Sequence, residues 1–120
     1  MNVHYKTGDS DIRPWGTWEV LISSENFVIK KIVVLSQKIL SLQLHHHRSE
    51  HWIILQGTGI VTLDGTTFTV QQNDHIFIPK KHKHRIKNDT NTPLIFIEIQ
   101  TGDILDENDI VRFQDEYGRV

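Results

Sequence analysis

The chain has 120 residues, with 13 Lys and Arg against 15 Asp and Glu, so its formal net charge is −2 at pH 7. This length suits one domain with its own core, and no basic excess points to a nucleic-acid partner. The absence of cysteine excludes disulfides, thiolate metal sites and cysteine nucleophiles. Because the N-terminus lacks the apolar core of a signal peptide and no apolar run is long enough to span a membrane, we expect a cytoplasmic protein with no membrane partner.

Short strand-like segments follow a polar arm at residues 1–12. Residues 18–22 and 27–35 are rich in Val and Ile, which favour strands, and residues 40–44 alternate apolar with polar side chains. Further strands are expected at 51–56, 60–63, 66–71, 75–78, 85–87 and 94–100, separated by turn signals such as Asp64-Gly65. Many short strands at close spacing predict an all-β sandwich or barrel, in a single domain over residues 1–120.

The C-terminal tail, residues 103–120, carries the one helical signal in the chain. Asp106 is a possible N-cap residue, and Asp109 follows three residues later, which is a weak form of a capping box. We therefore expect a short helical turn in a tail that folds over the opening of the barrel.

Residues 43–52 concentrate polar chemistry between two apolar runs. Within this stretch stand four histidines, an arginine and a glutamate. Burying such groups is costly unless something compensates for their lost hydration, and a metal ion with a bound anionic substrate would do so.

The histidine spacing indicates which side chains could hold that ion. Side chains alternate along an extended segment, so His45 and His47 can share one face and converge. Three imidazoles and a carboxylate suit zinc, cobalt, manganese, nickel or iron. The expected ligands are therefore His45, His47, Glu50 and His84, with His46 as the open alternative for a position in this set. A solvated loop or a partner surface is the other interpretation, and the gathering of histidines around one carboxylate makes it the weaker one.

Two blocks of the sequence, residues 45–57 and residues 79–88, resemble the paired motifs of the cupin superfamily. The first cupin motif contains H-x-H, three or four residues, E, six residues and G, and the second ends in P-x-G, two residues, H, three residues and N. The positions in register are Glu50, Gly57, Pro79, His84 and Asn88. Among the departures, only two residues separate His47 from Glu50, and Asn73 and Lys81 stand at glycine positions. The resemblance implies a cupin-type double-stranded β-helix, that is, a jelly-roll barrel.

A longer series of motifs resembles the C-terminal domain of type II phosphomannose isomerases. The matching segments are Arg13-Pro14-Trp15-Gly16 and residues 42–52, 78–85, 97–102 and 107–119. Those enzymes usually carry a mannose-1-phosphate guanylyltransferase domain in front. The resemblance implies a stand-alone, metal-dependent isomerase of mannose 6-phosphate and fructose 6-phosphate. No glycine-rich nucleotide-binding stretch precedes the cupin segment, so guanylyltransferase activity is not expected.

The implied reaction needs a group that moves a proton between C2 and C1. His51 and Glu98 are the candidates, because each lies beside a matching motif. Glu50 could act as base or ligand, and we take it as a ligand. Arg48 is expected at the cavity mouth as a further catalytic residue.

The substrate's phosphate needs cations with fixed geometry, which favours arginine. Arg112 and Arg119, both in the tail, are the expected phosphate contacts, and surface salt bridges are the alternative role for them. Of the tryptophans in matching segments, Trp52 is expected in the core, and Trp15 is left open between core and sugar contact.

Two other functions fit the same resemblance. One is a non-catalytic sugar-phosphate-binding cupin that works with a separate mannose-1-phosphate guanylyltransferase. The other, which the arginines argue against, is dioxygenase chemistry. A homodimer is expected, because small cupins often pair through barrel edges and open sheet edges favour association.

Overall fold

The computed structural model describes residues 5–118, and all its regular secondary structure in that range is β-strand. This confirms the predicted all-β class. The strands are β1 (Ser10–Arg13), β2 (Gly16–Ser23), β3 (Phe27–Val34), β4 (Leu42–Leu44), β5 (Arg48–Gln56), β6 (Thr58–Leu63), β7 (Thr66–Gln71), β8 (His75–Ile78), β9 (His84–Lys87), β10 (Leu94–Gly102) and β11 (Val111–Gln114). No helix in residues 5–118 is long and apolar enough to cross a membrane.

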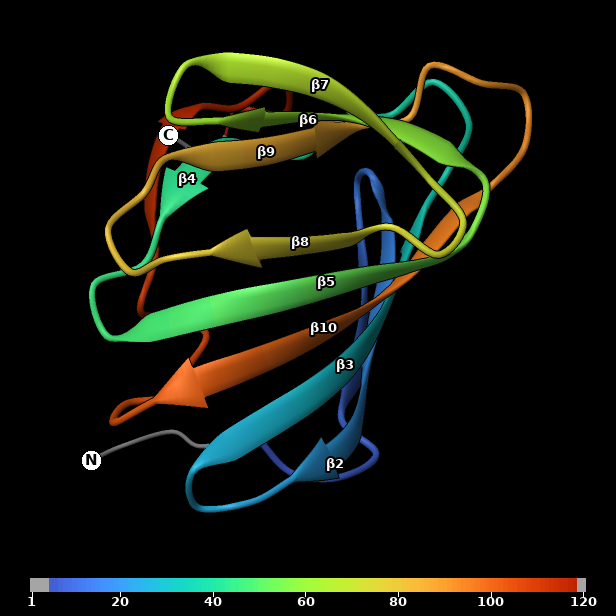
Figure 1. The fold of residues 1–120 in the computed structure, drawn as a ribbon. Coiled ribbons are helices and arrows are strands. Elements are labelled where there is room, and N and C mark those ends of the chain that lie inside the picture. Colours follow the sequence, from blue (N-terminus) through green and yellow to red (C-terminus); the bar gives the residue numbers. More distant parts are fainter. Residues whose placement is uncertain (1–4, 119–120) are drawn as a thin grey trace.

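The strands form two antiparallel sheets that face each other, as a jelly roll requires. The six-stranded sheet has the order β1-β2-β3-β10-β5-β8, and the five-stranded sheet has the order β11-β4-β9-β6-β7. In Figure 1, β7, β6 and β9 lie at the top, and β8, β5, β10 and β3 run below them. Segments far apart in sequence therefore meet across the interior.

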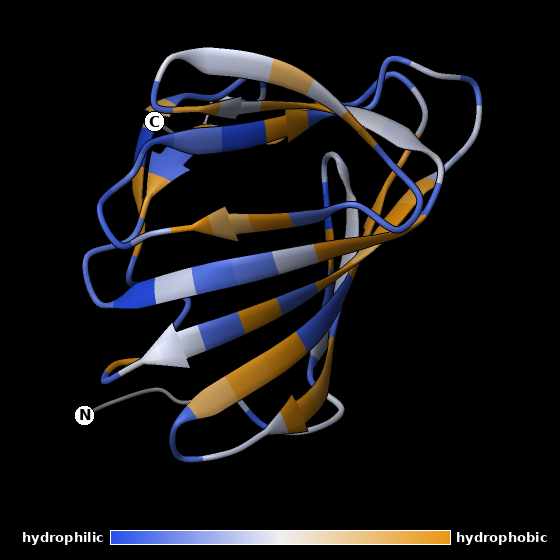
Figure 2. Ribbon diagram, in the orientation of Figure 1, coloured by the Kyte–Doolittle hydropathy of each residue, from blue (hydrophilic) through white to orange (hydrophobic). Residues whose placement is uncertain are grey.

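The inward faces of β5 and β10 divide the interior into an apolar end and a polar end. Buried and partly exposed side chains alternate along both strands, which is the two-residue period of a sheet with one covered face. Trp52, at 2 % exposure, Ile54 and Phe96 pack in the apolar core, which confirms the prediction for Trp52. Near the start of β5 the buried residues are Arg48 and Glu50, and Figure 2 shows this part of the strand as hydrophilic. The polar end is therefore where a site can form.

The tail forms a turn and a strand where a helical turn was predicted. The Asp109 N–H donates to the carbonyl of Asp106 (3.1 Å), and the Asn108 N–H donates to the Asp106 carboxylate (2.7 Å). An aspartate whose carboxylate accepts the backbone N–H two residues further on favours a turn over a helix. The chain then continues as β11, whose backbone groups pair with β4.

The described part of the N-terminal arm belongs to the folded body. Tyr5 is only 6 % exposed and packs in a small cluster with Val20, Val28 and Leu105. From Ser10 onward the chain pairs with β2 as strand β1. The arm and the tail thus meet at the polar end of the barrel, through Tyr5 and Leu105.

Candidate metal centre and cavity

A cavity of about 400 Å³ lies between the two sheets at the polar end of the barrel. The six-stranded sheet contributes Lys30, Glu50 and Glu98 to its walls, and the five-stranded sheet contributes Gln43 and His84. Charged groups buried in such a space need partners, because their hydration is lost.

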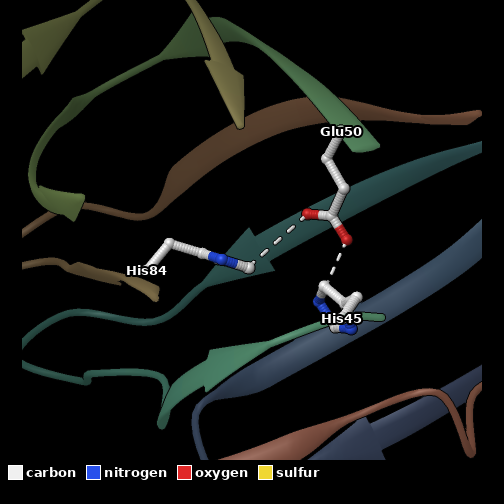
Figure 3. Close-up of side chains that lie close together, drawn as sticks. All are labelled: His45, Glu50 and His84. Carbon is white, nitrogen blue, oxygen red and sulfur yellow. Dashed lines mark ion pairs between the residues drawn. The ribbon is translucent and has the colours of Figure 1, made fainter. Parts of the chain in front are cut away.

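The side chains of His45, Glu50 and His84 converge inside this cavity. One potential ligand atom from each lies within 4.8 Å of the other two, and all three residues are buried. His45 Nε2 is 3.2 Å from Glu50 Oε2, and His84 Nε2 is 3.9 Å from Glu50 Oε1. Figure 3 shows both imidazoles directed at opposite oxygens of the one carboxylate.

Backbone carbonyls set the tautomers of the two imidazoles. His45 Nδ1 is 2.6 Å from the carbonyl oxygen of Asp109, and His84 Nδ1 is 2.9 Å from that of His82. A carbonyl oxygen can only accept, so each Nδ1 carries a proton, and each Nε2 is the ring nitrogen that can offer a lone pair to a metal ion in the cavity. This is the outer arrangement that holds metal-binding histidines in proteins.

The protonation states also suit a cation. Burial, with the nearby charges of Arg48 and His84, lowers the pKa of His45 to about 3, so its imidazole is neutral at pH 7. Burial acts to raise the pKa of Glu50, but Arg48 and His84 outweigh it and lower that pKa to about 2. Two imidazole nitrogens and an ionised carboxylate are a ligand set for a divalent transition metal. The residues present therefore fit such an ion.

Arg48 lies behind this cluster and not at the cavity mouth. It is 7 % exposed, and its Nε donates to Glu50 Oε2 at 2.8 Å. Its NH2 is 3.3 Å from His45 Nε2, and its NH1 donates to the carbonyl of Asp106 at 3.3 Å. The guanidinium therefore orients the glutamate and the histidine and ties them to the tail.

His47 and His51 do not lie with the cluster, which corrects two sequence-based assignments. The side chain of His47 is 46 % exposed, with Nδ1 3.9 Å from the carboxylate of exposed Asp103. On β5, Glu50 faces inward, so the next residue, His51, faces outward. There its ring stacks on His75, with 3.0 Å between Nδ1 and Nε2, and does not line the cavity.

Glu98 does line the cavity, next to the cluster. It is 8 % exposed and its Oε2 accepts a hydrogen bond from Gln100 Nε2 at 2.8 Å. Burial, the charge of Glu50 and a hydrogen bond between the two carboxyl groups raise the pKa of Glu98. The site thus holds two adjacent carboxyl groups whose environments push their pKa values apart, an arrangement that suits acid–base chemistry.

Of the two arginines assigned to the phosphate, Arg112 lines the cavity from β11. Its register partner is Gln43 on β4, and Gln43 in turn pairs with His84 on β9. Arg119 lies outside the described residues.

Gln43 is a site residue that sequence reasoning missed. It lines the cavity and lies opposite His84 in the β4–β9 pairing, so the two side chains share the inward face. The signal was the cupin spacing: Gln43-x-His45, four residues, Glu50, six residues, Gly57 fits the first motif without a gap. The prediction from His45-x-His47 sets the motif two residues late, with His47 at the position that His45 occupies.

Asp109 is a second missed residue. Its two carboxylate oxygens accept the N–H groups of His46 and His47, at 2.9 Å each, while its carbonyl accepts from His45 Nδ1. One tail residue therefore holds the turn after β4 and fixes the ring of His45. No local pattern indicated this role of Asp109, because 64 residues separate it from His45 in the sequence.

The comparisons with known proteins show which family the chain belongs to. Residues 2–115 match the family model described as "Mannose-6-phosphate isomerase C-terminal". A mannose-1-phosphate guanylyltransferase from Escherichia coli is 43 % identical over 119 residues, which cover 99 % of this chain and 25 % of that protein. The chain thus spans about a quarter of the length of the curated relatives it matches.

Solved structures support the fold at low sequence identity. The cupin domain of Schizosaccharomyces pombe Cnp3 superposes with a TM-score of 0.70 at 20 % identity, covering 72 % of this chain and 64 % of that one. The capsular polysaccharide assembling protein CapF from Staphylococcus aureus gives a TM-score of 0.77 at 16 % identity, covering 88 % and 34 %. The chain has the cupin fold and belongs to the mannose-6-phosphate isomerase C-terminal family.

Proposed function

We propose that this domain is a metal-dependent aldose–ketose isomerase that interconverts mannose 6-phosphate and fructose 6-phosphate. The observation that carries the proposal is the position of Glu98, a buried carboxyl group that lines the same cavity as Glu50 of the ligand cluster. Membership of the isomerase family supplies the substrate class.

His45, Glu50 and His84 would hold the metal ion, with Gln43 as a further oxygen donor. A divalent ion bound there supplies Lewis-acid stabilisation of negative charge on the sugar's C1 and C2 oxygens. Zinc, cobalt, manganese, nickel and iron all suit this ligand set.

Glu98 is the proposed proton carrier. In the open-chain sugar the C2 proton must leave and a proton must arrive at C1, while the hydroxyl proton on O2 leaves and O1 gains one. The environment of Glu98 raises its pKa, so the ionised form is a stronger base than an ordinary glutamate and returns the proton readily. Gln100, which donates to Glu98 Oε2, holds the carboxyl group in place.

The test is a coupled assay for fructose 6-phosphate formed from mannose 6-phosphate. Chelator-stripped protein would receive each metal singly, and the expected result is turnover that returns with metal and is lost in Glu98→Gln. Binding of the sugar phosphate with no turnover for any metal would instead support the alternative, a binding cupin that works with a separate guanylyltransferase. Oxygen consumption with iron would point to dioxygenase chemistry.

A further inference from the structure

Lys30 is a buried cation in the cavity wall with no role in the proton transfer proposed above. It is 5 % exposed, lies in the middle of β3, and lines the cavity. Its ammonium group sits 3.8 Å from the ring centre of Tyr5 and 4.4 Å from that of Trp18. Among residues 5–118 this ammonium forms no hydrogen bond and no ion pair.

The aromatic contacts compensate only part of the cost of burying this charge. A cation over an aromatic ring is stabilised by about 0.5–2 kcal/mol, whereas burying an unpaired ion costs several kcal/mol. Desolvation accordingly lowers the pKa of Lys30 to about 8, although Glu98 acts in the opposite direction. A group held this way in a cavity is suited to an anionic ligand.

The strand register places Lys30 two strands away from β5, which carries Glu50 of the ligand cluster. Lys30 pairs with Glu98 on β10, and Glu98 pairs with Trp52 on β5, the strand that carries Glu50. Two strand spacings put the backbones of β3 and β5 about 10 Å apart. A six-carbon sugar phosphate with its C1–C2 end at the cluster would pass over Glu98 and bring its phosphate toward Lys30.

The opposite sheet has a matching arrangement. Arg112 pairs with Gln43 on β4, and Gln43 pairs with the ligand His84 on β9, so Arg112 is also two strands from a ligand. Facing sheets in a sandwich lie about 10 Å apart. Long cationic side chains from both walls can therefore approach one anion from two sides.

We infer that Lys30 is a phosphate-contacting residue and that it holds the substrate's phosphate together with Arg112, at the far side of Glu98 from the metal cluster. This rests on the proposed function, whose substrate it places. The phosphate provides the ion-pair partner that Lys30 lacks among residues 5–118, so the cavity favours phosphorylated over free sugars.

The test compares Lys30→Met, which keeps the length and removes the charge, with Lys30→Arg, which keeps the charge. Lys31→Met is the matched control, because the neighbouring lysine is exposed on the outer face of the same strand. The measurements are kcat and KM for mannose 6-phosphate, the inhibition constant of inorganic phosphate, calorimetric binding of both compounds, and the melting temperature.

We expect Lys30→Met to raise KM and the phosphate inhibition constant by about tenfold or more, the size of one charge-assisted hydrogen bond. Its kcat should change much less, its melting temperature should rise, Lys30→Arg should recover most of the binding, and Lys31→Met should behave as wild type. Unchanged phosphate inhibition in Lys30→Met, or a loss confined to kcat, would overturn the assignment.

The outcomes separate this inference from the proposed function. Wild-type turnover with normal phosphate binding in Lys30→Met would leave the isomerase and remove the subsite. Phosphate binding that depends on Lys30, without turnover in wild type, would support the phosphate subsite and overturn the isomerase. Wild-type protein that binds neither mannose 6-phosphate nor inorganic phosphate would overturn both.

Discussion

Gln43 and His84 lie directly opposite each other in the antiparallel pairing of β4 with β9. Side chains opposite each other on one face of a sheet are about 5 Å apart at Cβ, so the amide of Gln43 belongs beside the imidazole of a proposed ligand. The segment before the histidine run therefore lies against the proposed ligand cluster, along with the run itself.

We predict that Gln43→Ala weakens metal binding by about tenfold while leaving the stoichiometry at one ion, because it removes one oxygen donor or its supporting contact. Competition with a coloured chelator measures the affinity. Gln37→Ala is the control, since Gln37 is an exposed glutamine outside the cavity. An affinity equal to that of wild type would remove Gln43 from the site.

The ligand set itself gives the second prediction. His45→Ala, Glu50→Gln and His84→Ala should each lose stoichiometric zinc or cobalt, because each removes one of three converging donors. His47→Ala should keep it, since the His47 side chain is 46 % exposed and lies outside the cluster. Elemental analysis of dialysed protein measures the metal content, and metal loss in His47→Ala would restore the ligand set expected from the H-x-H spacing.

Asp109 should affect the affinity for the metal ion without contacting the ion itself. In Asp109→Asn one carboxylate oxygen becomes an amide nitrogen, which cannot accept the N–H of His46 or His47. The turn that aims His45 is then less well held, and we expect a loss of about 10–100-fold in metal affinity, the range for groups that support metal ligands. Asp103→Asn is the matched control, because Asp103 is exposed and its one ion-pair contact within residues 5–118 is with the exposed His47, at 3.9 Å.

Glu98→Gln should lower kcat by about 100-fold or more, the lower end of what general acid–base groups contribute. His51→Ala should stay close to wild type, since His51 lies on the outer face against His75. Both variants should bind metal normally, which the elemental analysis checks. A large loss of kcat in His51→Ala with normal kcat in Glu98→Gln would reverse the assignment.

Lys30 should make the free energy of unfolding depend on pH in the alkaline range. Its pKa is about 8 in the folded chain against 10.5 ordinarily, so the unfolded chain binds more protons between those values. The free energy of unfolding should therefore rise with pH across this window, by about 3 kcal/mol in all as an order of magnitude. Urea unfolding of ligand-free protein at a series of pH values measures this, and the Lys30→Met variant should lack the rise that wild type shows.

The sequence by itself determined the all-β class, most strand positions, the burial of Trp52, and the presence of a histidine–glutamate site with Glu50 and His84 in it. These follow from local causes: the two-residue alternation of strands, turn-forming residues, and a motif whose spacing survives in sequence. The same local rules placed the histidine pair two residues late, because three consecutive histidines offer several equivalent registers.

Only the tertiary structure decided which histidines face the cavity. The ring of His45 is oriented by the hydrogen bond that it donates to the carbonyl of Asp109, 64 residues away, and His51 is turned outward by the register of β5 against β10. The cavity position of Lys30 was likewise set by pairing with a distant strand, since Lys30 lies opposite Glu98 on β10. Contacts of this kind depend on which strands meet across the barrel, and no window of local sequence contains that information.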